Sequence, residues 1–240
     1  MPGAATHLAI ADRIYAVLGG RVLQDAPLFY GGSIAPDAVH AKQGYQRADK
    51  KRSHLCDGIR SYGYGYPEMA ALFRSRLDAF IRDNAGRSGK DLYLGYVVHL
   101  MTDEIYLLST YKRLETALLG GGALEDMAVF RKKLADEVNS GEHRSFFRED
   151  GDLRNILPHE YAFSQNVEAL LNQRWDYAVE NYMGADEINA SKRWVLDTCF
   201  KREPDAPPRD RTEAVRCIDA SAEEITARLS AARVPVRRCV

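Results

Sequence analysis

The chain has 240 residues, a formal net charge of −1, 45% hydrophobic residues and 28% charged residues. This length suits one large domain or two small ones, and the composition is ordinary for a globular protein. The near-zero charge offers no broad basic surface, so nucleic acid is disfavoured as a partner without being ruled out. No apolar run approaches the roughly 20 residues that cross a bilayer, so we expect no transmembrane segment.

The N-terminal segment predicts an amphipathic helix from Ala4 to Leu18 that ends at a Gly-Gly pair. His7 shares the apolar face with Ile10 and Ile14, so its side chain is expected to point inward. On its own it would be read as a core histidine bonded to a backbone carbonyl. The segment lacks the basic start and continuous apolar stretch of a signal peptide. We therefore expect a cytoplasmic protein whose four cysteines, none in a CxxC pair, are free thiols.

Residues 29–67 are rich in Gly, Pro and polar side chains and show neither a helical nor a strand period. A long connection without regular structure is usually functional or disordered, and its aromatic residues argue against disorder. Asp37 follows a proline in this segment, and its plain structural role would be a helix N-cap. His54 follows a short basic run that would ordinarily be a solvated turn.

The central prediction is a buried helix from Asp91 to about Leu119, preceded by a helix over 67–84. The stretch DLYLGYVVHLMTDEIY is apolar on nearly every side, which is typical of a buried helix. His99 and Asp103 lie one turn apart on it, with no Lys or Arg on their face. An isolated buried carboxylate is costly. The alternatives are a His–Asp hydrogen bond, an arginine from another element, or a metal ion.

Further helices are predicted over about 124–138, from Pro158 through Trp175 to about 182, over 186–200, and from Ser221 to about 232. The last begins with a capping-box pattern, since Glu224 follows Ser221 by three residues. No segment alternates with a period of two. We expect an all-α protein with a single multi-helix domain over residues 1–202, built around the buried central helix, followed by a C-terminal linker and helical arm over 203–240.

Three histidines and two aspartates stand at inward or constrained positions: His7, Asp37, His54, His99 and Asp103. Imidazole and carboxylate are ligands that zinc accepts, and other divalent transition metals are possible. These side chains exceed what one tetrahedral ion needs. If Asp103 bridged, they would hold two ions, an arrangement suited to phosphoester hydrolysis.

This ordered set of motifs resembles the zinc-dependent phospholipase C family, whose all-helical fold is shared with the S1/P1-type nucleases. The motifs are THLAIA around His7, GSIAPDAV around Asp37, KRSHL around His54, and GYVVHLMTDEIY around His99 and Asp103. The resemblance covers about the first 110 residues, and the combination is more specific than any one motif. It implies a phospholipase C/P1 nuclease-type fold.

The resemblance also implies roles. Asp37, His54, His99 and Asp103 would hold one zinc, and Asp103 would bridge to a second zinc that His7 also binds. A zinc-activated water would attack a phosphoester, phospholipid being one candidate, with Asp37 as the base. Arg47 and Lys51 are candidates to contact the phosphate, although both are read more simply as surface charges.

Two departures from the family pattern keep other functions open. Exported family members begin with a Trp that completes the second zinc site, whereas this chain begins Met-Pro-Gly, and Pro2 after removal of Met1 is one replacement. The available His143, His159 and Glu160 do not match the spacing of the family's third site, so no third metal is predicted. The alternatives are a metal-binding helical protein without hydrolytic activity, and a helical partner-binding module without metal.

Overall fold

The computed structural model describes residues 2–59, 67–119, 156, 158–173, 176–201 and 211–231. Regular structure in these ranges is helical, and the described residues form no strand, only isolated bridges between Gly19 and Leu23 and between Val179 and Met183. The prediction of an all-α protein is therefore confirmed.

The helices follow one another closely in the first half of the chain. The described elements there are α1 (Ala4–Leu18), α2 (Ala26–Gly32), the 3₁₀ helix η1 (Ala35–Ala41), α3 (Arg47–Ser53), α4 (Pro67–Asn84) and α5 (Lys90–Leu119). The later described elements are η3 (Pro158–Glu160), α8 (Val167–Asn172), α9 (Ala185–Val195), the π-helical turn η4 (Leu196–Phe200) and α10 (Arg211–Ala231). The helices predicted over 4–18, 67–84 and 186–200 are confirmed.

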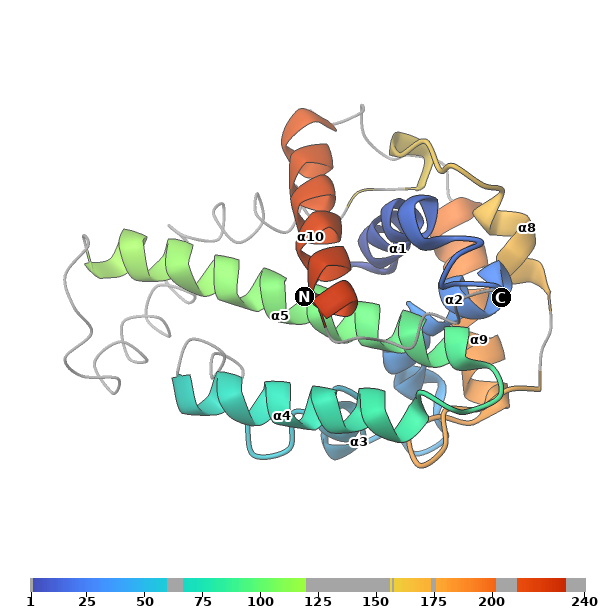
Figure 1. The fold of residues 1–240 in the computed structure, drawn as a ribbon, viewed down its shortest axis with the longest axis horizontal. Helices are drawn as coiled ribbons and strands as arrows, with labels where there is room; N and C mark the ends of the chain where they lie inside the picture. Colours follow the sequence, from blue (N-terminus) through green and yellow to red (C-terminus); the bar gives the residue numbers. More distant parts are fainter. Residues whose placement is uncertain are drawn as a thin grey trace.

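The centre of the fold is α5, which runs the length of the molecule with α4 beside it and α10 crossing it (Figure 1). Every residue from 91 to 104 is buried. The periodicity predicts this burial, because apolar side chains occupy nearly the whole circumference of the helix. The buried central helix is therefore confirmed over the stretch that carries His99 and Asp103.

Helices α2 and α5 approach each other closely through two glycines. A Cβ atom built on Gly32 would lie 2.1 Å from the carbonyl oxygen of Leu92, and one built on Gly95 would lie 2.1 Å from that of Phe29. Only glycine permits such an approach of two backbones. The crossing brings the end of α2, at Ser33, against the turn of α5 that carries His99.

A second buried carboxylate joins the N-terminal helices to the later part of the chain. Asp12 of α1 is 1% exposed, and both of its carboxylate oxygens accept hydrogen bonds. Its Oδ1 accepts from the hydroxyls of Tyr30 at 2.7 Å and Ser164 at 2.6 Å. Its Oδ2 accepts from the backbone N–H of Ser164 at 2.9 Å and the hydroxyl of Tyr161 at 3.4 Å. This network holds residues 161–164 against α1 and α2.

The irregular connection predicted over residues 29–67 is wrong in its described part. It contains the end of α2 and the whole of η1 and α3, each seven residues long. Two turns are too short to show a convincing period, so pattern alone could not find them. Asp37 is not an N-cap, because it lies in the first turn of η1, whose N-cap is Ile34.

Two predictions in the C-terminal part are also wrong. The long helix over 158–182 is replaced by η3, α8 and a tight turn in which Val179 bonds to Met183 around Asn181, whose φ is 68°. The last helix begins at Arg211, so Ser221 lies inside α10 and caps nothing. The helix predicted over 124–138, His143 and Trp175 lie outside the described residues.

Helix α10 packs against α1 and α5. Arg13 on α1 contacts Asp219 at 2.8 Å, and Arg228 reaches the buried Glu104 of α5 at 2.7 Å. The part of residues 203–240 that the structure describes is therefore bound to the helices of the N-terminal half. A search of the described helices finds none with the length and apolar character needed to cross a membrane.

Candidate metal centre

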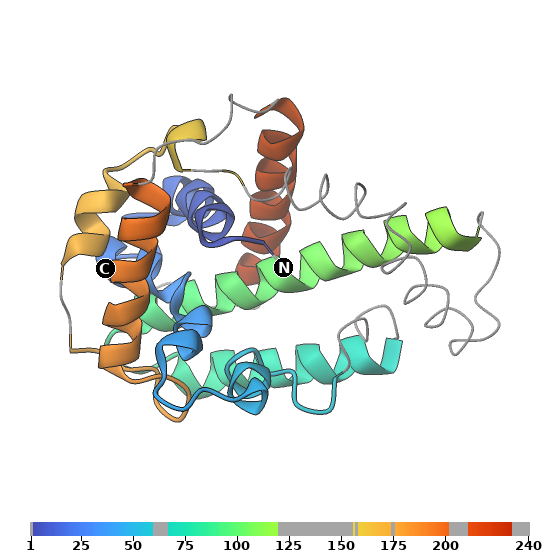
Figure 2. The ribbon, with the colours of Figure 1, turned by 180° about the vertical axis from the view of Figure 1, so that it is seen from behind.

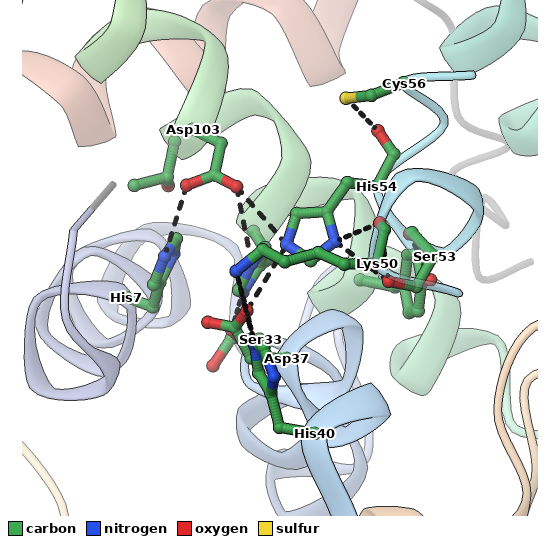
Figure 3. Close-up of polar contacts among 12 residues, drawn as sticks. His7, Ser33, Asp37, His40, Lys50, Ser53, His54, Cys56 and Asp103 are labelled. Atoms are coloured by element: carbon green, nitrogen blue, oxygen red, sulfur yellow. Dashed lines mark hydrogen bonds and ion pairs between the residues drawn. The ribbon is translucent and has the colours of Figure 1, made fainter. Parts of the chain in front are cut away.

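Five side chains from four places in the chain converge beside the middle of α5 (Figure 3). His7 comes from α1, Asp37 from η1, and His54 directly follows α3. His99 and Asp103 come from α5 itself. The residues selected from the sequence are thus the ones that the fold brings together.

Asp103 lies among three histidines, and no Lys or Arg of the described residues forms an ion pair with it. Its Oδ1 is 3.6 Å from Nε2 of His7, and its Oδ2 is 3.5 Å from Nε2 of His54 and 3.7 Å from Nε2 of His99. Asp37 joins the group through Oδ1, which is 3.4 Å from the same nitrogen of His54. These separations are too long for good hydrogen bonds.

The separations fit a shared metal ion. Four-coordinate zinc with bonds of about 2.0–2.1 Å places neighbouring ligand atoms about 3.3–3.4 Å apart, close to the observed values. The atoms that face one another are also buried without a hydrogen-bond partner; they are Nε2 of His7, His54 and His99 and both carboxylate oxygens of Asp103. Buried polar groups are rarely left unsatisfied, so the donor set fits a metal.

The ligand atoms fall into two overlapping groups. One is His7, His99 and Asp103, and the other is Asp37, His54 and His99, with the atoms of each group within 4.8 Å of one another. His99 belongs to both groups, whereas the resemblance makes Asp103 the shared residue. Asp103 still contacts His7 and His54 through different oxygens, as a bridging carboxylate would.

Backbone carbonyls hold two of the imidazoles with Nε2 toward the cluster. Nδ1 of His99 lies 2.8 Å from the carbonyl oxygen of Ser33, and Nδ1 of His54 lies 3.0 Å from that of Lys50. Since a carbonyl can only accept, each Nδ1 carries the proton and each Nε2 presents a lone pair. This is the usual outer support of a metal-bound histidine. His7 instead stacks on His99, with ring centroids 3.7 Å apart.

Burial keeps the histidines in the form that binds metals. Burial, followed by the neighbouring His99, holds the pKa of His7 well below its ordinary value, and burial also lowers the pKa of His99. Burial raises the pKa of Asp103 to about 6. Burial alone would also raise the pKa of Asp37, but the close approach of His54 and the neighbouring His99 and Lys50 lower it below its ordinary value. The neutral imidazoles of His7 and His99 and an ionised Asp37 are ready to act as ligands.

A cleft of about 530 Å³ opens beside the cluster. His7, Asp37 and His99 form part of its lining, and Lys50 and His40 lie next to Asp37. Its other wall is α9, which packs beside η1 (Figure 2), and contributes Ala190, Ser191, Trp194 and Val195. A small organic molecule fits a cavity of this size.

The remaining sequence candidates lie elsewhere. Arg47 and Lys51 are exposed on α3 and are not among the residues that line the cleft. His159 and Glu160 lie in η3 and belong to neither group of candidate ligands. The residue that sequence reasoning missed is Lys50, which stands one helical turn before His54; that spacing was the available signal.

No protein-family model, curated protein or solved structure matches this chain. The resemblance to the zinc-dependent phospholipase C family therefore rests on the motifs quoted above.

Proposed function

We propose that this protein is a metal-dependent phosphoester hydrolase of the phospholipase C-like type, with one or two zinc-type ions held by His7, Asp37, His54, His99 and Asp103. The observation that carries the proposal is the convergence of buried, unpartnered imidazole nitrogens and carboxylate oxygens on one point beside a cleft. A bound ion of this kind polarises a phosphoryl oxygen and makes water nucleophilic near neutral pH.

The two aspartates differ in a way that suits different tasks. Asp103 is 3% exposed and faces three histidines, so its role is to hold the cluster together. Asp37 has a side chain that is 30% exposed and lines the cleft. A carboxylate at the cleft can accept a proton from an attacking water, which is the base role that the resemblance assigns to Asp37.

The proposal covers several classes of phosphoester. The cleft has room for a small phosphoester or for the headgroup of a phospholipid. Three kinds of compound therefore deserve comparison: a phosphatidylcholine-like lipid, a nucleic-acid phosphodiester and a small soluble phosphoester.

Metal content and turnover should be measured together on protein purified without a His-tag or chelator. We expect zinc-type ions in the wild type by elemental mass spectrometry, and metal-dependent hydrolysis of at least one of these compounds. His99→Ala and Asp103→Asn should lose both properties while remaining folded by circular dichroism. Asp78→Asn and His159→Ala alter exposed residues of the same types and should retain both.

Each failure has a distinct meaning. Bound metal without turnover of any phosphoester would favour a metal-binding helical protein without hydrolytic activity. Absence of metal, even after zinc is added back, would favour a partner-binding module in which His99 and Asp103 are core groups.

A further inference from the structure

We propose that Lys50 forms an anion subsite in the cleft, which makes the site prefer a dianionic phosphomonoester to a monoanionic phosphodiester. The inference rests on the proposed function, because it assigns a substrate class to the same site. It depends on where Lys50 lies and on which charges surround it.

Lys50 contacts the proposed metal ligands through both its backbone and its side chain. Its carbonyl oxygen is the hydrogen-bond partner of His54 Nδ1, so the residue cannot shift without moving a ligand. Its Nζ lies 3.0 Å from Oδ1 of Asp37 and 3.4 Å from Nε2 of His40 (Figure 3). The side chain is 25% exposed and lines the cleft.

Among the described residues that line the cleft, Lys50 is the one lysine or arginine. Its companions with titratable side chains are Asp37 and three histidines, His7, His40 and His99. The ammonium of Lys50 lies 3.0 Å from the carboxylate of Asp37, so these two groups form an ion pair at the wall of the cleft.

These two charges balance each other only while Asp37 has no other partner. When Asp37 serves as a metal ligand, its negative charge is shared and no longer neutralises Lys50. The ammonium then faces the cleft without a full counter-ion, in a place where solvent is limited, and an incoming anion can supply that charge. A phosphomonoester dianion brings one more negative charge than a diester, so it gains more from Lys50.

The rival explanation is that Lys50 is only a structural counter-ion for Asp37. Removal of its charge would then affect folding or metal retention but not anion binding. The two explanations separate when metal content and anion affinity are measured on the same variants.

The test uses the full chain loaded with zinc at about pH 8, where inorganic phosphate is mostly a dianion. Calorimetry measures the binding of inorganic phosphate and of dimethyl phosphate, a monoanion. We expect Lys50→Met to keep its fold and metal content but to bind phosphate about 10-fold to 100-fold more weakly, with a smaller loss for dimethyl phosphate. Lys50→Arg should recover most of the affinity. Arg52→Gln, which removes an exposed charge from the same helix, should change neither affinity.

Turnover gives an independent reading. The ratio of kcat/KM for p-nitrophenyl phosphate to that for bis(p-nitrophenyl) phosphate should fall about 10-fold in Lys50→Met. Unchanged phosphate affinity in a folded, metal-loaded Lys50→Met protein would overturn the subsite, and so would loss of metal from that variant. If the wild type hydrolyses nothing yet binds phosphate through Lys50, the proposed hydrolase fails and the anion subsite stands.

Discussion

Two buried aspartates, Asp12 and Asp103, occupy opposite situations in this protein. Asp12 accepts hydrogen bonds from Tyr30, Tyr161 and Ser164 on both of its oxygens. Asp103 is buried to a similar degree, yet neither of its oxygens has a hydrogen-bond partner. Its neighbour Glu104 shows the other common solution, since Arg74 and Arg228 pair with that carboxylate at 2.8 Å and 2.7 Å.

The comparison shows that this chain can satisfy a buried carboxylate when the role is structural. An unsatisfied carboxylate costs stability, and Asp103 is surrounded by imidazoles that are themselves unsatisfied. The contrast favours a site shaped for a ligand over a poorly packed core. It also predicts that the two aspartates respond in opposite ways to substitution and to metal.

The largest difference should appear when each aspartate is changed to asparagine in metal-free protein. Asp12→Asn places an amide among hydroxyl and N–H donors, and we expect it to lower the free energy of unfolding by about 2–4 kcal/mol. Asp103→Asn removes an unpaired buried charge and should change it by less than about 1 kcal/mol. Urea denaturation measures both. Equal losses would remove the distinction between the two sites.

Removal of metal should lower thermal stability only in proteins that retain Asp103, whether or not they retain Asp12. A ligand present at 100 times its Kd stabilises the folded state by about 2.7 kcal/mol. Chelation should therefore lower the Tm of the wild type and of Asp12→Asn, and leave that of Asp103→Asn unchanged. Thermal scans with and without chelator give the comparison; an equal shift in all three proteins would place the bound metal elsewhere.

The glycine crossing of α2 and α5 should affect both stability and metal binding. A methyl group at Gly95 would meet the carbonyl oxygen of Phe29 at 2.1 Å, so Gly95→Ala should cost about 1–3 kcal/mol. The helices must separate to admit it, which disturbs the bond between Ser33 and His99. We expect a lower zinc affinity by calorimetry in the folded variant. Gly86→Ala, where a Cβ meets nothing within 4 Å, is the control.

The smallest expected effect is the pH dependence of the metal-free protein. The pKa values of His7 and His99 in the folded state lie below the ordinary value of 6.5, so their stabilisation is present above pH 6.5 and is lost as the pH falls. As the pH falls, the unfolded chain takes up protons at both histidines, and the uptake in the folded protein at Asp103, whose pKa is about 6, offsets part of that difference. Stability should fall by about 1 kcal/mol between pH 6.5 and 5.5. No decrease in denaturant midpoint over this interval would contradict neutral buried imidazoles.

Periodicity was sufficient to predict α1, α4 and α9 and the burial of α5. It failed for α2, η1 and α3, because seven residues contain too few turns to establish a period. The start of α10 was also predicted wrongly, because Ser221 and Glu224 have the spacing of a capping box although both lie inside the helix.

The candidate ligands could be selected by residue type and order, because few other side chains bind transition metals. Their supports could not be selected in this way. Ser33 supports His99 with its backbone carbonyl, a group that every residue has, so its side chain gives no signal. Trp194, which forms part of the cleft wall, is far in sequence from the candidate ligands. The four-residue spacing to His54 favours Lys50 over Lys51 only if this segment is a helix, and the sequence did not predict α3.

The contact between Ser33 and His99 also has a kinetic consequence. The two residues are 66 positions apart, and the contact forms only after α2 has docked on α5 through its glycines. We therefore expect the oriented ligand set to assemble after this docking and to be lost when the two helices separate. An ion bound there should prolong the lifetime of the folded protein while leaving the rate of folding nearly unchanged.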